Sequence, residues 1–139
     1  MASIKVVSPQ QAQGRLEKIY QRVRAPDGQV DNVLQAHSLR PHTMEGHMAL
    51  YKAVLHHSGN QLPEWYLEAV GVLVSRLNAC AYCVGHHTAG LERLLKAGSL
   101  DFKAYLSALD LNDPGEPFTS CEQLGLAYAR KLTHTPGQI

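Results

Sequence analysis

The segment PEWYLEAVGVLVSRLNACAYCVGHHTAGLERLLKAG, residues 63–98, decides the fold because it predicts two long helices joined by a tight turn. In its first half, apolar side chains recur at the three- and four-residue steps of one helix face: Leu67, Val70, Val74 and Leu77. Val72 and Leu73 broaden this face, which predicts a helix buried on most sides. Asn78 interrupts the pattern, and a second helix is expected from about Cys80 to Lys96. We therefore expect a central antiparallel helical hairpin.

The rest of the chain divides into helix-length pieces at its Gly and Pro residues. Further helices are expected to begin at Ser8-Pro9 (Ser8 as the N-cap), after Asp31, near His42, near Phe102 and after Thr119. Thr119 and Glu122 form a capping-box pair, which is typical of a helix start. No segment shows the sustained two-residue alternation of a half-buried strand. We predict an all-α fold of six or seven helices in a single domain over residues 1–139.

The first and last of these helices carry apolar stripes, from which we predict their buried faces. The two stripes are Ala12, Leu16, Ile19 and Val23, and then Leu124, Ala127, Tyr128 and Leu132. Cys121 stands alone on the last helix and is expected to be a small buried hydrophobe. Thr135-Pro136 has the pattern of another helix start three residues before the chain stops. We expect either a frayed tail or a further helix in this fold.

Length, charge and cysteine content exclude several classes of protein. A chain of 139 residues with 45% hydrophobic residues fits one domain with a real core. Thirteen Lys and Arg against twelve Asp and Glu exclude nucleic-acid binding through bulk positive charge. No apolar run approaches the ~20 residues of a membrane-spanning helix, and the first twenty residues lack a signal-peptide core. Three cysteines make no disulfide framework, so we expect a cytoplasmic protein that binds neither nucleic acid nor membrane.

Cys80, Cys83 and His87 are the side chains that point to chemistry. On a helix these three positions fall within a sector of ~60°, close to the helix N-terminus. The helix dipole and a nearby imidazolium both favour the thiolate form of a cysteine, and the second cysteine lies close enough to form a disulfide. His86 is less well aligned with the pair. This spacing favours thiol redox chemistry over structural packing or a metal site.

Glu68 is expected to join this group across the hairpin. It lies ten residues before Asn78, and His87 lies nine residues after it, so the two side chains reach the same level. The apolar neighbours of Glu68 predict partial burial and therefore a need for a partner. In that position the carboxylate would orient the imidazole and raise its basicity. The alternative is that Glu64 or Glu68 pairs with Arg76 or another surface charge.

The run from Glu68 through eleven residues to CAYCVGHH, residues 80–87, resembles the core motif of the alkylhydroperoxidase AhpD-like proteins, which belong to the carboxymuconolactone decarboxylase superfamily. Three flanking segments, HSLRPHTMEGHMALYKAVLHH, VSRLNACAYC and YARKLTHTP, resemble its peroxidase-related branch. The resemblance covers roughly residues 30 to 136. It is specific because the glutamate, both cysteines and the histidine stand at the expected separations.

The resemblance implies an all-helical homo-oligomer, a trimer or hexamer, that reduces hydroperoxides with a cysteine pair and needs no bound cofactor. An external thiol or dithiol donor would recycle the pair. By position, Cys83 matches the attacking cysteine and Cys80 the resolving one, while His87 and Glu68 match a proton relay. Tyr82 stands where the best-known member has a second histidine, so a less complete relay is expected. Members commonly continue with one or two helices beyond the Thr-Pro pair.

Three alternatives remain open at this point. A zinc site would take its ligands from Cys80, Cys83, His86 or His87, and His56 or His57. A decarboxylase or lactone-processing enzyme is an alternative by superfamily analogy only. A non-catalytic helical assembly module would also account for the broad apolar faces. Covalent haem attachment is excluded, because Val84 stands where the CxxCH motif needs histidine.

Overall fold

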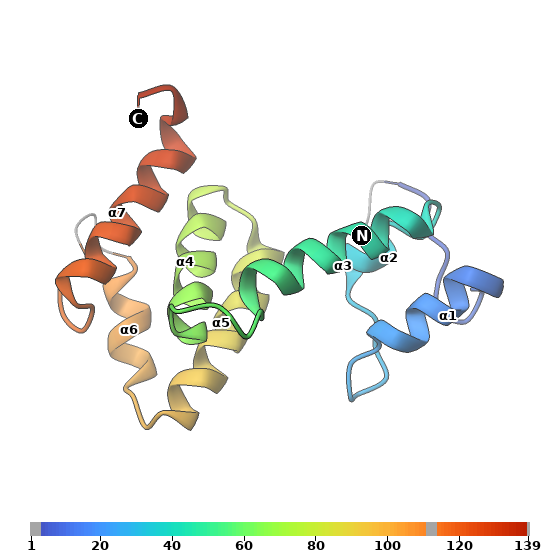
Figure 1. The fold of residues 1–139 in the computed structure, drawn as a ribbon, viewed down its shortest axis with the longest axis horizontal. Coiled ribbons are helices and arrows are strands. Elements are labelled where there is room, and N and C mark those ends of the chain that lie inside the picture. The colour runs from blue at the N-terminus through green and yellow to red at the C-terminus, as the bar shows by residue number, and fades with distance from the viewer. Residues whose placement is uncertain (1–3, 111–113, 139) are drawn as a thin grey trace. The chain divides into compact units, whose positions relative to one another are not determined.

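The protein is described by a computed structural model, which covers residues 4–110 and 114–138. Over these residues the chain forms seven α-helices and one short 3₁₀ helix without a β-strand, which confirms the predicted all-α fold (Figure 1). The chain divides into two compact units, Met1–His57 and Ser58–Ile139. The single domain expected from the chain length stays a prediction. None of the helices in the described ranges has both the length and the apolar character needed to cross a lipid bilayer.

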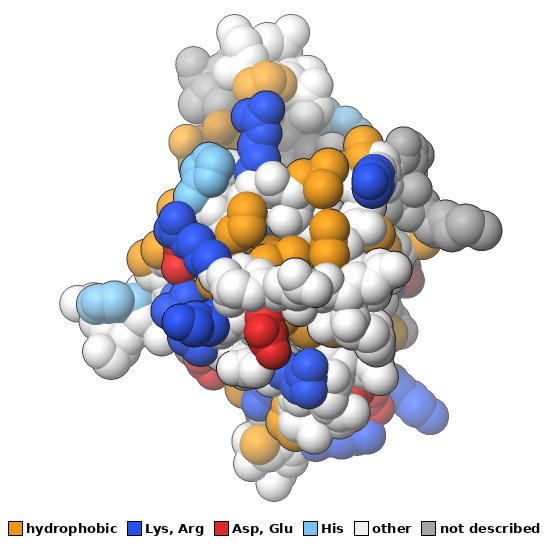
Figure 2. All heavy atoms as spheres, turned by 90° about the vertical axis from the view of Figure 1, so that its right-hand side faces the viewer, with side chains coloured by type: hydrophobic (Ala, Val, Ile, Leu, Met, Phe, Trp, Pro, Cys, Tyr) orange, Lys and Arg blue, Asp and Glu red, His pale blue; other side chains and the backbone are white. Residues whose placement is uncertain are grey.

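The first unit contains helices α1 (Gly14–Val23), α2 (Asn32–Gln35) and α3 (Pro41–Leu55). They enclose a small core of buried side chains: Ala12, Leu16, Ile19, Tyr20, Val30, Leu34 and Met44. The stripe predicted for the first helix is confirmed, since three of its members are buried and Val23 packs against them. On its outer surface this unit leaves large apolar side chains exposed: Ile4, Val33, Leu39, Leu50 and Val54. Figure 2 shows a face where apolar side chains gather near the middle, with Lys and Arg around them.

The predicted start of the first helix at Pro9 is wrong. Residues 8–11 form a turn, in which the Gln11 amide donates to the Ser8 carbonyl, and α1 begins only at Gly14. The segment before the turn is held by tertiary bonds instead. The Tyr20 hydroxyl donates to the Val7 carbonyl at 2.8 Å, and the Val7 amide donates to the Ser38 hydroxyl at 2.8 Å. These long-range bonds outweigh the local capping preference of Ser8-Pro9.

Helices α1 and α3 are also joined by charged side chains. Glu45 accepts hydrogen bonds from Arg15 at 2.5 Å and from Arg22 at 2.9 Å. These two hydrogen bonds lower the pKa of the Glu45 carboxyl below its ordinary value. Because all three side chains are exposed to water, the ion pairs add little to stability and mainly align the two helices.

The second unit contains α4 (Glu64–Leu77), α5 (Ala81–Ala97), α6 (Phe102–Ala108) and α7 (Ser120–His134), followed by η1 (Pro136–Gln138). Helices α4 and α5 lie side by side as the expected antiparallel hairpin, and α7 packs on another side of α4 (Figure 1). Their core consists of the following side chains: Tyr66, Ala69, Val72, Leu73, Leu91, Leu95, Tyr105, Ala108, Leu109, Phe118 and Leu126. The hairpin is therefore the centre of this unit.

The deepest face of α4 differs from the predicted stripe. Four predicted members are only partly buried: Leu67, Val70, Val74 and Leu77. Val72 and Leu73, which broaden the predicted face, are buried as expected, and Tyr66 and Ala69 are also at most 4% exposed. The reason is that α5 and α7 cover two different sides of α4, so the packing of two neighbours selects the deepest face. In a helix that is apolar on most sides, the sequence pattern alone does not identify the most deeply buried face.

The predicted buried face of α7 is wrong. Its capping box is confirmed, with Thr119 donating to Glu122 at 2.7 Å, but its stripe is exposed: Leu124 is 73%, Tyr128 54% and Leu132 41% exposed. Helix α7 turns Leu126 inward instead, because the Tyr66 hydroxyl of α4 donates to the Glu122 carbonyl at 2.8 Å. Cys121 is also exposed, which corrects its expected burial. The pattern Asp113-Pro114-Gly115 predicts the end of the segment before α7, but Asp113 lies outside the described residues.

Candidate active site

Cys80 and Cys83 lie at the N-terminus of α5, in the turn of the hairpin. Their sulfurs are bonded as a disulfide, and their Cα atoms are 5.3 Å apart, within the ordinary range for such a bond. Cys80 is the N-cap of α5, and its sulfur accepts a hydrogen bond from the Cys83 amide at 3.3 Å. An N-cap side chain faces the positive end of the helix dipole. In the reduced protein this position favours the thiolate of Cys80.

Two backbone hydrogen bonds to the last turn of α4 hold the turn that leads to Cys80. The Cys80 amide donates to the Ser75 carbonyl at 3.0 Å, and the Ala79 amide donates to the Arg76 carbonyl at 2.9 Å. These two bonds define a Schellman motif, in which the residue after the helix takes a left-handed conformation. Ala79 fills this place with φ of +52°, where glycine is the usual residue. Backbone strain is therefore stored directly beside the disulfide.

The structure brings Glu68 and His87 together across the hairpin. Oε2 of Glu68 lies 2.7 Å from Nδ1 of His87, which confirms the predicted level of the two side chains. The Glu68 side chain is 8% exposed and the His87 side chain 26% exposed, so this contact is largely shielded from water. Arg76, which the alternative pairs with a glutamate, contacts Asp110 at 2.5 Å instead. A buried carboxylate has thus found the partner that its burial requires.

This bond assigns the proton on the imidazole ring. A carboxylate oxygen only accepts hydrogen bonds, so Nδ1 of His87 carries the proton and donates it to Glu68. The opposite nitrogen, Nε2, is then the basic atom of a neutral ring. His87 lies four residues after Cys83 on the same helix, at the spacing that places side chains on one face. His87 therefore lies on the same face of α5 as Cys83, one helical turn further along the helix.

Tyr82 lies on a different part of the α5 surface. Its ring is packed against His86 with centroids 4.3 Å apart, and both side chains are exposed. Tyr82, which stands where the resembled motif has a second histidine, therefore contacts His86. His86 is the histidine that is less well aligned with the cysteine pair. Tyr82 and His86 therefore pack against each other on the exposed surface of α5.

Two residues at this site escaped the sequence analysis. Gly71 of α4 faces the His87 ring, and Gly90 of α5 faces the Glu68 carboxylate. The signal in the sequence is a glycine inside each predicted helix, where glycine is unfavourable. The sequence does not show which side chain lies opposite each glycine, so this signal alone does not assign the two glycines to the site.

The ligand set expected for zinc is not assembled. In the part of the chain that the structure describes, no group of three or more His, Cys, Asp or Glu side chains is arranged to hold a metal ion. Cys80 and Cys83 are bonded to each other, and Nδ1 of His87 is bonded to Glu68. These contacts differ from the arrangement of a tetrahedral metal centre.

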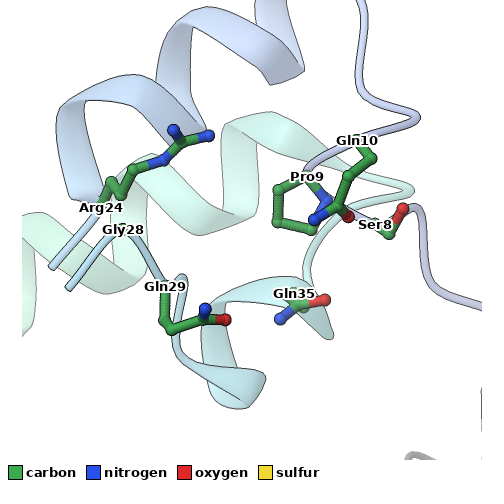
Figure 3. Close-up of a pocket in the computed structure, with 7 residues that line it drawn as sticks. All are labelled: Ser8, Pro9, Gln10, Arg24, Gly28, Gln29 and Gln35. Carbon is green, nitrogen blue, oxygen red and sulfur yellow. The ribbon is translucent and has the colours of Figure 1, made fainter.

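A separate cavity of about 380 Å³ lies within the first unit. It is lined by Ser8, Pro9, Gln10, Arg24, Gly28, Gln29 and Gln35. Figure 3 shows the polar ends of Arg24 and Gln29 extending toward the same open space. Its lining includes neither a cysteine nor a histidine.

No protein-family model, no curated protein and no solved structure matches this chain. The resemblance to the AhpD-like proteins therefore depends on the flanking segments quoted above and on the spacing of four residues: Glu68, Cys80, Cys83 and His87. These four residues form one bonded pair of side chains and one disulfide at the same hairpin. Membership of that family remains a proposal.

Proposed function

We propose that this chain is an AhpD-like, thiol-dependent hydroperoxide reductase with Cys83 and Cys80 as its redox pair. The observation that carries the proposal is the shielded Glu68–His87 bond, which orients a base one helical turn from Cys83. A cysteine pair that serves only packing has no need of such a base. A substrate of small or alkyl hydroperoxide type fits, because the reaction needs only an accessible thiolate and a proton donor.

The first half of the reaction oxidises Cys83. Nε2 of His87 takes the proton of the Cys83 thiol, and Glu68 stabilises the imidazolium that forms. The thiolate attacks the terminal oxygen of the hydroperoxide, the O–O bond breaks, and Cys83 becomes a sulfenic acid. The departing alkoxide takes the proton from His87 and leaves as the alcohol. The peroxide is reduced by two electrons, which come from the sulfur.

The second half forms the disulfide. Cys80, whose thiolate is favoured at the N-cap of α5, attacks the Cys83 sulfur and expels hydroxide, which is protonated to water. The Cys80–Cys83 bond corresponds to this oxidised state. An external thiol or dithiol donor then reduces the bond by thiol–disulfide exchange and restores both thiols. A reducing compartment such as the cytoplasm supplies donors of this class.

The proposal is tested by peroxide-dependent disulfide formation in the reduced protein. Cumene hydroperoxide and hydrogen peroxide are added under anaerobic conditions, and thiol loss is followed by a gel mobility shift after alkylation. We expect two thiols to be lost for each peroxide consumed, and turnover once dithiothreitol or dihydrolipoamide is supplied. A Cys121→Ser variant is the matched control, because that cysteine is exposed and unpaired in a disulfide. Thiols that survive excess peroxide would contradict the proposal.

The exposed face of α7 favours self-association as a second property of this protein. Leu124, Tyr128 and Leu132 are separated by one helical turn each and are all more than 40% exposed. A contiguous apolar stripe of this kind is unfavourable in water unless another surface covers it. The same stripe would suit a non-catalytic assembly module, but such a module does not require the Glu68–His87 bond. We propose a homo-oligomer, a trimer or hexamer as the resemblance implies.

A further inference from the structure

Two glycines lie in the interiors of the hairpin helices, each opposite one member of the Glu68–His87 pair. A Cβ atom on Gly71 would lie 2.5 Å from Nδ1 and 2.7 Å from Cγ of His87. A Cβ atom on Gly90 would lie 2.8 Å from Cδ and Oε1 of Glu68 and 3.0 Å from Oε2. All these distances are shorter than van der Waals contact. A side chain at either position would therefore displace the paired group or push the helices apart.

The arrangement is reciprocal. Gly71 follows Glu68 by three residues on α4, and Gly90 follows His87 by three residues on α5. Because the helices are antiparallel, His87 covers Gly71 while Glu68 covers Gly90. Each helix thus supplies one functional side chain and, one turn later, the space for the other.

We propose that Gly71 and Gly90 are positioning residues that create the space in which Glu68 orients His87. The inference depends on the proposed function, because the orientation matters only if His87 acts on a cysteine. The atoms nearest to Gly71 belong to His87, and those nearest to Gly90 belong to Glu68. Each acts through the side chain opposite to it.

Other helical glycines show that this is not a general property of the fold. Gly46 in α3 and Gly85 in α5 have no atom within 4 Å of an added Cβ. Gly125 in α7 is crowded, but by the hydroxyl of Tyr66, a structural contact between α4 and α7. Glycine weakens a helix relative to alanine, so a glycine kept at a crowded position indicates a steric requirement. Among the glycines in the described helices, only Gly71 and Gly90 have Glu68 or His87 as that requirement.

The close packing at the two glycines affects the hydrogen bond between Nδ1 of His87 and Glu68. Glu68 is buried, and its carboxylate lies directly against Gly90. An alanine at Gly90 would force the carboxylate away from Nδ1, and an alanine at Gly71 would tilt the ring away from the carboxylate. Either change removes the group that stabilises the imidazolium, and the Cys83 thiolate then loses a stabilising neighbour.

The test is the titration of the thiols in the reduced Cys121→Ser protein, followed by thiolate ultraviolet absorbance and by the rate of alkylation against pH. We expect Gly71→Ala and Gly90→Ala to move the midpoint of the Cys83 titration upward by about one pH unit. At pH values below the midpoint, this corresponds to about tenfold less thiolate. Gly85→Ala, on the same helix but in open space, should leave the titration unchanged. Gly125→Ala should lower the melting temperature without moving the titration.

A double-mutant cycle separates positioning from a general disturbance of packing. Gly90→Ala should cause no further shift in a Glu68→Ala protein, because the group that it displaces is already absent. Gly71→Ala should likewise cause no further shift in a His87→Ala protein. If Gly90→Ala alone does not fold, Glu68→Ala should restore its melting transition, since it removes the clashing carboxylate.

Two results would overturn the inference. One is a thiol titration in both glycine variants equal to that of the parent protein. The other is an equal shift with and without the clashing partner, which would show that the glycines act through general packing. Neither readout uses peroxide. A chain that consumes no peroxide would contradict the proposed function while leaving the coupling measurable, and active glycine variants with normal titrations would contradict only this inference.

Discussion

Glu68 and His87 are joined by a 2.7 Å contact between Oε2 and Nδ1 that links the two central helices at a buried point. Nineteen residues separate them in the chain, and the turn at residues 78–80 folds α5 back on α4 to bring them together. The contact satisfies a carboxylate that would otherwise be unpaired in the core, and it leaves Nε2 of the imidazole as a base. One bond thus serves both the stability of the hairpin and the chemistry proposed for it.

Replacing Glu68 with glutamine should affect chemistry more than folding. Glu68→Gln keeps the size of the side chain but removes the charge that stabilises the imidazolium, so we expect peroxide turnover to fall by about 100-fold. The melting temperature should change much less than the rate. Glu92→Gln is the matched control, because Glu92 on α5 forms an exposed ion pair with Lys96. Equal rates in the two variants would show that Glu68 has no part in the reaction.

Cys83→Ser and Cys80→Ser should stop the reaction with peroxide at different steps. Cys83→Ser should abolish both peroxide consumption and sulfenate formation, because the cysteine beside the oriented base is lost. Cys80→Ser should react once and stop as a sulfenic acid on Cys83, which a dimedone probe traps and mass spectrometry locates. Because Cys80 is the N-cap of α5, its own thiolate is also stabilised, so the assignment needs this direct test. Probe labelling of Cys80 in the Cys83→Ser protein would reverse the two roles.

Ala79 should be replaceable by glycine with a gain in stability. Its φ of +52° is costly for a residue with a Cβ atom, and Ala79→Gly should raise the free energy of unfolding by up to about 1 kcal/mol. Ala89→Gly, at an exposed position inside α5, should lower it by about the same amount. Urea unfolding of both variants measures the difference. Destabilisation of the same size in both would show that Ala79 is not strained.

His37 should make the first unit sensitive to mild acid. Partial burial lowers the pKa of His37 below its ordinary value of 6.5, and the nearby His47 lowers it further. The unfolded chain therefore binds a proton at higher pH than the folded chain, so stability falls as the pH drops below about 6.5 toward the folded pKa. His37→Gln should flatten this dependence in thermal unfolding between neutral and acidic pH. His42→Gln, at an exposed position on α3, should not, and equal slopes in the two variants would contradict the prediction.

Self-association should depend on the exposed face of α7. Leu124→Lys places a charge at the most exposed position of this apolar stripe, so the mass measured by light scattering should fall toward 15.3 kDa. Leu62→Lys is the control, since Leu62 is 53% exposed outside this helix and its substitution should leave the mass unchanged. A parent protein that is already monomeric at micromolar concentration would contradict the prediction at once.

Much of the hairpin could be predicted because its signals are local. Asn78 is the C-cap of α4 and Cys80 the N-cap of α5, within one residue of the expected positions. Once the turn was placed, the antiparallel direction and the rise per residue put Glu68 level with His87. The capping box of α7 was predictable for the same reason, since its two hydrogen bonds join residues three apart. The sequence determined these features because each depends on short separations along the chain.

The tertiary structure alone decided which faces are buried and where the space lies. Helix α7 exposes the stripe that its sequence predicts to be buried, because Tyr66 of α4 binds its backbone at Glu122 and turns Leu126 inward. Gly71 and Gly90 are ordinary helical glycines until His87 and Glu68 are placed against them. The sequence pattern of a helix identifies its buried face only when the apolar residues lie on a single side of that helix. Steric fit between two helices depends on the distance and rotation between them, and these are set by all the contacts of the core together.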